Sequence, residues 1–336
     1  MVILGRTRTQ ILVAVTFFVL AGISVAANDK AVGKELIERA WHLSDIRSDG
    51  APAFRLEGTF RVTAKKGGME TQGTYTEIWV SKTKWRQEEQ TSSTHRIEIG
   101  AGTKKWIASS GTDRLPTSFY LSPTLLFPRE TPEPKVTKIS ERKIDSANAA
   151  CVESKSQWSK GIDCVDPGSG VLLLHEIASM PNSIPSHQVC LYRNYEKFGD
   201  RLFPRFARCT SDPGEDVELT IVKLVAESPS EETLFTRPQG AIEAGNCQGG
   251  VAKPPHAEYS PDPGYPDHHN ENTTVVIWTI IAVDGKPQDV RIARSGGQDF
   301  DRLALEIAQK WRFKPATCDG LPMPAQINIE IAFRKF

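Results

Sequence analysis

From Phe54 to about Val225 the chain is a succession of short β-type stretches, and no other feature restricts the fold as strongly. The stretches are rich in Thr, Tyr, Trp, Val and Ile and are separated by glycine and polar turns. In the first of them, alternate positions hold Phe54, Leu56, Phe60 and Val62. Such alternation is typical of a strand with one buried face. Many strands of this kind in series predict an extended antiparallel sheet, curled into an open β-barrel.

One amphipathic helix is expected before this sheet, over residues 29–45. Apolar residues recur there at helical spacing, and charged residues occupy the other side. The apolar set is Leu36, Ile37, Ala40, Trp41 and Leu43, and the charged set is Lys34, Glu35, Glu38 and Arg39. We expect this helix to cover one face of the sheet. Residues 119–135, which contain several prolines, are expected to interrupt the strands as a crossing segment or lid.

The first residues of the chain predict its compartment. Arg6 and Arg8 precede an apolar run, residues 11–27, which ends in small residues. A basic N-terminal region, a short apolar stretch and small residues at the cleavage site are typical of a cleaved secretory signal peptide. A run of this length also lies at the short limit for spanning a bilayer, so a short uncleaved N-terminal anchor is the alternative.

The chain has 6 cysteines, and an even count in an exported protein favours disulfides. Two pairs flank stretches that read as β-hairpins, which would place each pair on opposite positions of adjacent strands. The third pair follows by elimination. Free buried thiols are the alternative if the chain stays in a reducing compartment. The expected bonds are Cys151 with Cys164, Cys190 with Cys209, and Cys247 with Cys318.

The last part of the chain predicts a compact ββαβ unit. A strand ends at the hairpin signal Asp284-Gly285, and a second strand follows it. Asp299 is expected to cap a helix that continues to Pro315. In the final strand, Ile327, Ile329, Ile331 and Phe333 alternate with Gln326, Asn328, Glu330 and Arg334. The fold class is therefore mainly β or α+β, with a small ββαβ domain after the large sheet.

Proline and glycine dominate the stretch between the two regions, where apolar periodicity is lost. We therefore expect a domain boundary there. The predicted parts are a signal peptide or anchor over 1–27, a β domain over 28–238, a linker over 239–273, and the ββαβ domain over 274–336.

The motifs in the sequence favour a non-catalytic protein without cofactor or metal. Basic and acidic residues balance at 41 each, which excludes the basic excess of most nucleic-acid binders. The sequence contains no nucleophile elbow, zinc-protease motif or phosphate-binding loop. His175-Glu176 falls in a strand and points to opposite faces, and Asn272-Thr-Thr formally matches a glycosylation acceptor. A metal site would need the side chains of His256, Glu258, Asp262, Asp267, His268 and His269, which lie in a solvated linker.

A binding function is the remaining interpretation, and two parts of the chain could provide a binding site. The interior of a curled sheet suits an acyl chain or an apolar peptide, and its candidate lining residues are Phe60, Tyr75, Trp79, Trp85 and Trp106. The alternative is that these side chains simply fill the core. The final strand, 325–333, could accept a partner's extended segment at its edge. The alternative there is a purely structural strand, or an edge covered by the linker.

Residues 261–335 resemble the TonB C-terminal domain family. The matching features, in the order of the family, are Tyr265-Pro266, Val283-Asp-Gly285, Val290 through Arg294-Ser295-Gly296, Trp311-Arg-Phe-Lys-Pro-Ala316, Gly320-x-Pro322 and the alternating last strand. The resemblance implies a periplasmic domain that contacts other envelope proteins. In the energy transducers of the family, this domain meets the N-terminal segment of an outer-membrane transporter by strand pairing. It implies partner-binding roles for Tyr265, Pro266, Gln326, Asn328 and Glu330.

Residues 29–238 resemble the LolA/LolB type of lipoprotein carrier, with one early helix and a long run of antiparallel strands. We therefore expect a periplasmic, non-catalytic envelope protein that takes part in transport or in coupling to outer-membrane partners. Two alternatives stay open. The β domain could carry lipoprotein acyl chains or another apolar ligand, or the whole chain could be an anchored, TonB-like energy transducer.

Overall fold

The structure is a computed structural model, and it describes residues 30–48, 50–64, 70–111, 135–156, 159–179, 187–212, 215–227, 231–245, 247 and 250–335. The predicted signal peptide or anchor, and all but the last residue of the predicted crossing segment, lie outside these ranges. Within them, no helix is both long and apolar enough to cross a membrane.

The chain forms two compact units. Unit 1 comprises residues 1–45, 127–204 and 210–213, and unit 2 comprises residues 46–126, 205–209 and 214–336. The C-terminal region therefore belongs to the same unit as the first strands of the large sheet.

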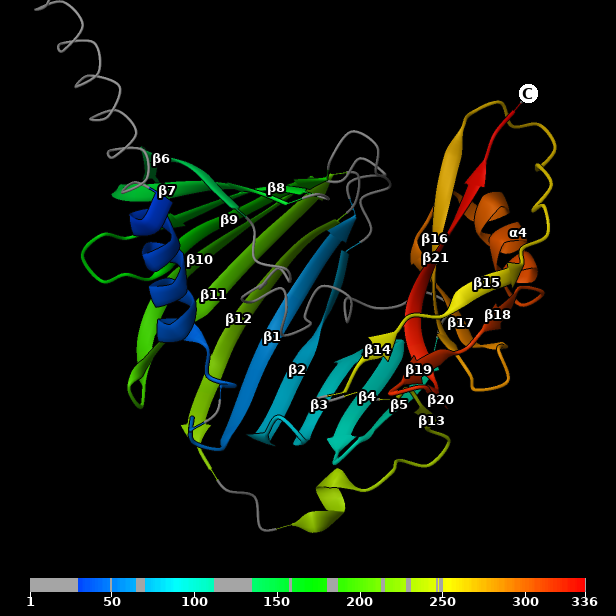
Figure 1. The fold of residues 1–336 in the computed structure, drawn as a ribbon, viewed down its shortest axis with the longest axis horizontal. Helices are drawn as coiled ribbons and strands as arrows, with labels where there is room; N and C mark the ends of the chain where they lie inside the picture. The colour runs from blue at the N-terminus through cyan, green and yellow to red at the C-terminus, as the bar shows by residue number, and fades with distance from the viewer. Residues whose placement is uncertain are drawn as a thin grey trace, which may run out of the picture. The chain divides into compact units, whose positions relative to one another are not determined.

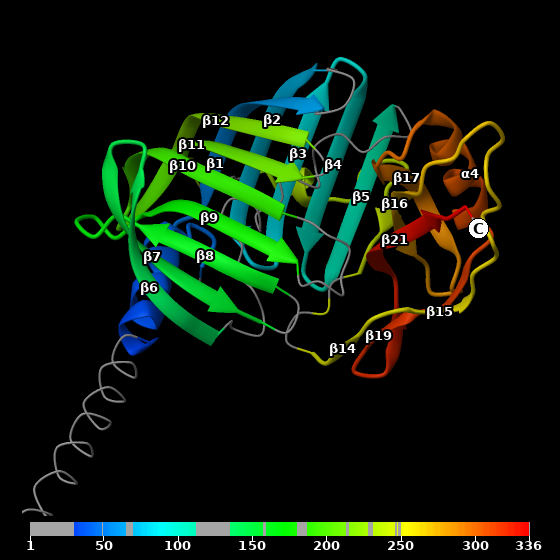
Figure 2. The same ribbon diagram turned by 90° about the horizontal axis from the view of Figure 1, so that it is seen from above.

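Among the described residues, thirteen strands form one antiparallel sheet that does not close (Figures 1 and 2). Its order is β13-β5-β4-β3-β2-β1-β12-β11-β10-β9-β8-β7-β6. The open antiparallel sheet that the sequence predicts is confirmed. The strands are β1 (Phe54–Ala64), β2 (Glu70–Ser81), β3 (Lys84–Thr91), β4 (Thr94–Ala101), β5 (Lys104–Gly111), β6 (Lys135–Ile144), β7 (Ala147–Lys155), β8 (Ser159–Val165), β9 (Leu172–Ser179), β10 (His187–Phe198), β11 (Arg201–Asp212), β12 (Glu215–Ala226) and β13 (Ile242–Glu243).

Alternation in the sequence places one face of β1 in the core. Phe54, Leu56 and Phe60 are buried, and Phe54 stacks on Trp79 of β2 with ring centroids 5.7 Å apart. A β-bulge at Glu57/Gly58 shifts the register between β1 and β12. A bulge of this kind increases the local twist of the two paired strands.

The predicted helix occupies residues 30–44. Gly33, Ile37, Ala40 and Ser44 form its buried stripe, at the spacing of one helix face. A Cβ atom on Gly33 would lie 2.9 Å from the Val136 side chain of β6. The helix therefore packs closely on the β6 end of the sheet, and glycine permits that approach.

All six cysteines are disulfide-bonded. Cys151 of β7 bonds to Cys164 of β8 across a directly opposed register pair. Cys247 bonds to Cys318, which are 71 residues apart. Cys190 and Cys209, on neighbouring strands β10 and β11, are the remaining bonded pair. These are the three pairs expected from the sequence.

The C-terminal region contains the predicted ββαβ unit, which we call the C-terminal module. Its elements are β16 (Thr273–Ile281), β17 (Pro287–Arg294), α4 (Gln298–Ala308) and β21 (Ala325–Phe333). The three strands form an antiparallel sheet of order β17-β16-β21. Helix α4 packs on one face through Phe300, Ala304 and Ile307, which meet the buried alternate residues of the strands.

Two local predictions about helix α4 are wrong. Gly297, not Asp299, is the N-cap, and no side chain caps the helix. The Asp301 carboxylate instead accepts hydrogen bonds from the Ser295 hydroxyl and the Gly296 amide, which organises the turn before the helix. The helix also ends at Ala308, well before Pro315. Residues 312–314 pair with another strand, and this tertiary pairing overrides the helical pattern.

The stretch expected to be a linker carries several short elements. A 3₁₀ helix, η1 (Glu232–Phe235), precedes it. After β13, β14 (Ala252–Lys253) pairs with β19 (Ala316–Cys318), which also pairs with β20 (Leu321–Met323). β15 (His256–Tyr259) pairs with β18 (Arg312–Lys314). These pairings and the Cys247–Cys318 bond tie the stretch to the C-terminal module.

Gly285 offers a test of the module's hairpin. It has φ of 79°, and an added Cβ would lie 2.0 Å from the Phe313 carbonyl oxygen. Gly285→Ala should therefore combine backbone strain with a backbone clash, and lower the free energy of unfolding by about 2–4 kcal/mol.

Gly264→Ala is the matched control for this change. Gly264 has φ of 68°, and nothing lies within 4 Å of an added Cβ. This control should cost only about 1 kcal/mol from the strained φ. Urea unfolding of both variants measures the difference, and equal losses would contradict the clash at Phe313.

Candidate protein-binding site

Strand β21 is the edge strand of the module's sheet among the described residues. It pairs with β16 over its whole length, from Ile281↔Ala325 to Thr273↔Phe333. Ile329, Ile331 and Phe333 are buried against the module's core, and the alternate residues are exposed. An edge strand leaves a row of backbone N–H and C=O groups without strand partners. This nine-residue edge is therefore a template for an added strand.

The residues proposed for partner binding fall into two groups. Gln326, Asn328 and Glu330 share one exposed face of β21. Tyr265 and Pro266 lie elsewhere: Pro266 is buried, and the Tyr265 ring packs edge-on against Phe300, with centroids 5.8 Å apart. The Tyr265 hydroxyl donates to the Glu271 carbonyl at 2.7 Å. The structure thus places these two residues in the module's packing rather than beside the β21 face.

The second face of the module's sheet packs against the large sheet within unit 2. Trp278 and Ile280 of β16 are buried with Ile107 of β5 and Ala244. Beside them, the Lys105 ammonium donates to the Gln326 amide oxygen at 3.4 Å. The polar face of β21 therefore begins at this contact, and Asn328 and Glu330 continue it with exposed side chains.

A buried charged cluster lies under Trp278. The Arg96 guanidinium lies over the Trp278 ring at 4.7 Å and donates to Glu98 Oε1 at 2.6 Å. The Lys105 ammonium lies 2.7 Å from Glu98 Oε2. Burial alone would raise the pKa of Glu98, but the positive charges of Lys105 and Arg96 lower it to about 2. Glu98 is therefore ionised at neutral pH.

The pKa of Glu89 is shifted in the opposite direction from that of Glu98. It faces Arg96 across β3 and β4 in the register, is 7% exposed, and its Oε2 atom has no hydrogen-bond partner among the described residues. Burial raises the pKa of Glu89 to about 8, against the opposing charge of Arg96. This cluster was not predicted from the sequence. The signal that could have found it is that three charged residues, Glu89, Arg96 and Glu98, occupy alternate positions of two successive strands, with the neutral, polar Gln87 beside them.

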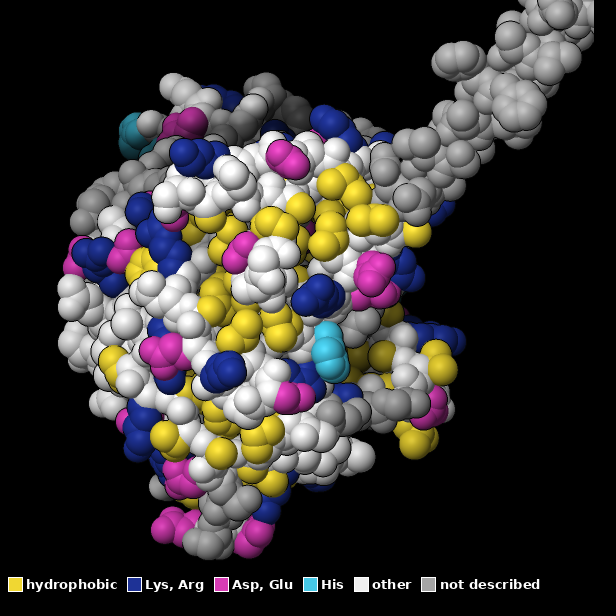
Figure 3. Space-filling view, turned by 90° about the vertical axis from the view of Figure 1, so that its left-hand side faces the viewer, with side chains coloured by type: hydrophobic (Ala, Val, Ile, Leu, Met, Phe, Trp, Pro, Cys, Tyr) yellow, Lys and Arg dark blue, Asp and Glu magenta, His cyan; other side chains and the backbone are white. Residues whose placement is uncertain are grey.

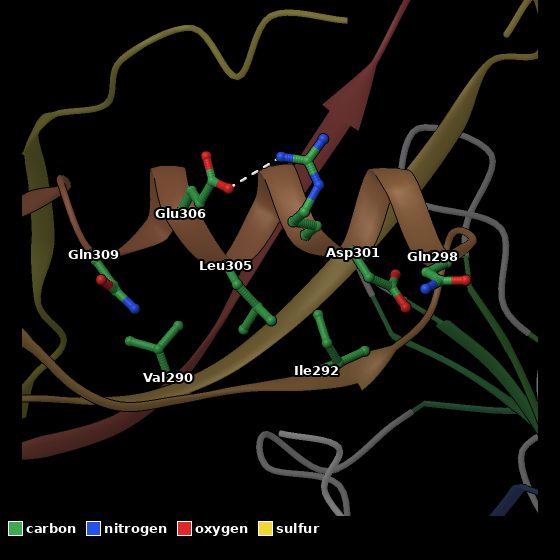
Figure 4. A pocket seen from close by; sticks show the side chains of 8 residues that line it. Val290, Ile292, Gln298, Asp301, Leu305, Glu306 and Gln309 are labelled. Atoms are coloured by element: carbon green, nitrogen blue, oxygen red, sulfur yellow. Dashed lines mark hydrogen bonds and ion pairs between the residues drawn. The ribbon is translucent and has the colours of Figure 1, made fainter. Parts of the chain in front are cut away.

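A groove runs between α4 and the other edge strand of the module, β17 (Figure 4). Leu305 of the helix faces Val290 and Ile292 of β17 across it, and its volume is about 550 Å³. Polar side chains line the rest of the groove: Gln298, Asp301, Arg302, Glu306 and Gln309. Arg302 and Glu306 form an ion pair at 3.1 Å. Among the described residues no strand pairs with the outer edge of β17, so this groove lies beside a second open strand edge, and its apolar part is formed by Val290, Ile292 and Leu305.

His269, one of the residues considered as a metal ligand, is held by two carboxylates. His269 lies between Glu271 (2.8 Å) and Asp299 (3.1 Å) and packs on Phe300. Hydrogen bonds to Glu271 and Asp299 raise the pKa of His269. Among the residues that the structure describes, no group of three metal-ligating side chains comes together. His175, which was not among the metal candidates, is buried and forms a hydrogen bond with Asp163 at 2.8 Å.

The aromatic residues considered as an interior lining are mostly packed in the core. Phe60, Tyr75 and Trp79 are at most 5% exposed, while Trp85 and Trp106 are half-buried. The Tyr75 hydroxyl donates to Glu77 at 3.0 Å, and Glu77 pairs with the Arg47 guanidinium. At the surface, hydrophobic side chains are interspersed with charged ones on the face seen in Figure 3.

Comparison with known proteins supports the resemblance of the C-terminal module. Residues 262–334 match the family described as Gram-negative bacterial TonB protein C-terminal. This match points to a protein of the cell envelope. No curated protein sequence matches the chain significantly.

Solved structures similar to this chain include members of the lipoprotein-carrier type. A LolA superfamily protein from Nitrosomonas europaea is 14% identical, with a TM-score of 0.41, over 61% of this chain and 97% of that one. A putative outer membrane lipoprotein-sorting protein domain from Vibrio parahaemolyticus is 12% identical, with a TM-score of 0.42, over 60% and 97%. A DUF1329 family protein from Desulfovibrio piger is 10% identical, with a TM-score of 0.43, over 62% and 97%.

Glu89→Gln and Glu98→Gln should change stability in opposite directions. The folded protein keeps the Glu89 proton up to about pH 8, whereas the unfolded chain loses it near pH 4.5, so this carboxyl costs stability increasingly as pH rises between these values. Glu89→Gln should therefore raise the free energy of unfolding at pH 8 by about 2–4 kcal/mol and leave it unchanged below pH 4.5.

Glu98 contributes stability above pH 4.5, and this contribution is lost as pH falls toward about 2. Glu98→Gln should lower the free energy of unfolding at pH 7 by about 2–4 kcal/mol, because it leaves Arg96 and Lys105 without their carboxylate. Urea unfolding between pH 3 and pH 8 measures both variants. Changes of the same sign at pH 8 would contradict the opposite ionisation of the two groups.

Proposed function

We propose that this protein is an exported, non-catalytic periplasmic protein whose C-terminal module binds an extended segment of an envelope partner. The observation that carries the proposal is the edge of β21, which lies on the outside of the module's sheet over nine residues. An added strand would gain main-chain hydrogen bonds there, and side chains on the exposed face would contribute specificity. The match of residues 262–334 to the TonB C-terminal family supports this type of partner.

The exposed face of β21 indicates which partner side chains would complement it. Gln326 and Asn328 offer amide groups, and Glu330 carries a negative charge. A segment with polar or basic residues at alternate positions would complement this face. N-terminal segments of outer-membrane transporters are the partners we propose, with a role in transport or coupling across the envelope.

The charged cluster supports a binding role rather than catalysis. Its two carboxylates have well-separated pKa values, a property that also occurs in active sites. Here, however, Glu89 and Arg96 are 7% and 3% exposed, and the Trp278 ring covers the guanidinium. A substrate would have to displace the module to reach them. We therefore assign the cluster to docking of the module.

Two further functions remain separate proposals. A carrier of acyl chains would use the interior of the large sheet, and an apolar fluorescent probe tests it directly. An anchored transducer would retain residues 1–27 in the inner membrane. N-terminal sequencing of the mature protein distinguishes an anchored chain from a cleaved one.

Strand addition at β21 can be tested with a synthetic peptide that carries the N-terminal segment of an outer-membrane transporter. We expect binding to slow hydrogen exchange of the amides in residues 325–333. Glu330→Lys should weaken binding at least about tenfold, because it reverses the charge of this face and lysine opposes pairing at strand edges. Fluorescence anisotropy measures the affinity.

Glu306→Lys is the matched control, since Glu306 is also exposed but lies on α4 beside the second groove. It should leave the affinity unchanged. Loss of binding in Glu306→Lys alone would place the peptide in the groove beside β17 and refute the β21 edge. Absence of new protection in residues 325–333 would refute strand addition as well.

A further inference from the structure

Three lysines stand directly opposite one another on the first strands of unit 1. Lys135 of β6 is the register partner of Lys155 of β7, and Lys155 is the register partner of Lys160 of β8. Register partners project to the same face of a sheet, and all three side chains are exposed. Because neighbouring strands are about 4.8 Å apart, the row covers about 10 Å of surface. We call it the lysine row.

No carboxylate among the described residues forms an ion pair with the lysine row. The nearest acidic row on the same face holds Glu153 and Glu176, one step along the strands. Glu153 already lies 3.7 Å from Lys138 and 3.9 Å from Arg142. Glu176 lies 2.9 Å from His187 and 3.8 Å from Arg142. These two carboxylates are therefore shared with further basic groups, and the face carries an excess of positive charge.

Neither folding nor protection of the sheet edge explains the whole row. Like charges directly opposite each other destabilise a pair of strands. Lysines on an edge strand can block unwanted pairing, which accounts for Lys135 on β6. Lys155 and Lys160 lie on β7 and β8, which have strand neighbours on both sides. Protection of the sheet edge therefore does not account for these two lysines.

We propose that the lysine row is a docking surface for the phosphate headgroups of an anionic membrane. A lysine ammonium is a compact point charge on a flexible stem, without the planar fork that fixes the orientation of a carboxylate. Three such groups in a line suit a laterally mobile array of phosphates better than one defined protein partner. Each basic residue near an anionic lipid surface contributes about fivefold to the affinity. The inference uses the envelope location proposed above but is independent of strand addition at β21.

The experiment compares sedimentation of the full chain with phosphatidylglycerol vesicles and with phosphatidylcholine vesicles. The N-terminal run and its flanking Arg6 and Arg8 are the same in every variant, so comparison between variants removes their contribution. The wild-type protein should bind phosphatidylglycerol more strongly, and salt should weaken this preference. Lys135→Gln/Lys155→Gln/Lys160→Gln should reduce the preference at least about tenfold.

Lys253→Gln/Lys310→Gln/Lys314→Gln is the matched control, because these lysines are exposed and lie in the C-terminal region of the chain. It removes the same charge and should retain the preference. Equal losses in both triple variants would overturn the proposal, since net charge alone would then explain binding. Binding of polyglutamate, but not of phosphatidylglycerol, that requires the lysine row would also overturn it in favour of an acidic protein partner.

Folding of the triple variant has its own readout. Removal of the facing lysines relieves like-charge repulsion, so the midpoint of thermal unfolding should stay equal or rise. A lower midpoint would show that the lysines support the fold and would overturn our assignment of the row to binding.

Discussion

The arrangement of the C-terminal module depends on strand β16, which is buried on both faces. Its residues from Val275 to Ile281 are all at most 8% exposed. One set of alternate residues packs under α4, and the other set, including Trp278 and Ile280, packs on the large sheet. Burial of both faces leaves the lateral edges of the module's sheet as its strand-pairing surfaces. The proposed site on β21 follows from this constraint.

The same constraint explains the charged cluster. Burial of Trp278 places its ring over Arg96, and an uncompensated guanidinium at 3% exposure would be strongly destabilising. Glu98 supplies the compensating charge, and Lys105 connects the cluster to Gln326 at the start of β21. Gln326 at the start of β21 is therefore in contact, through Lys105, with the buried charges of the large sheet.

Much of the fold could be predicted, because alternation and helical spacing are local signals. The strands from Phe54 onward, the early helix and the alternating final strand all follow from residues close in sequence. The helix end at Ala308 and the cap at Gly297 could not be predicted, because they depend on the pairing of residues 312–314 with β15 and on the turn held by Asp301. Tyr265 likewise matches the family's pattern, yet its half-buried ring packs against Phe300 of the module's core.

The sequence by itself determined the strand-rich class, the ββαβ order, the three cysteine pairs and the polar face of the last strand. Each of these rests on short-range periodicity or on adjacent strands joined by a turn, apart from the third cysteine pair, which followed by elimination. Only the tertiary structure decided which charges face one another. The cross-strand register sets Lys135, Lys155 and Lys160 in one row and brings Glu89 opposite Arg96. Register depends on the pairing of whole strands, so a one-residue shift would send each of these side chains to the other face.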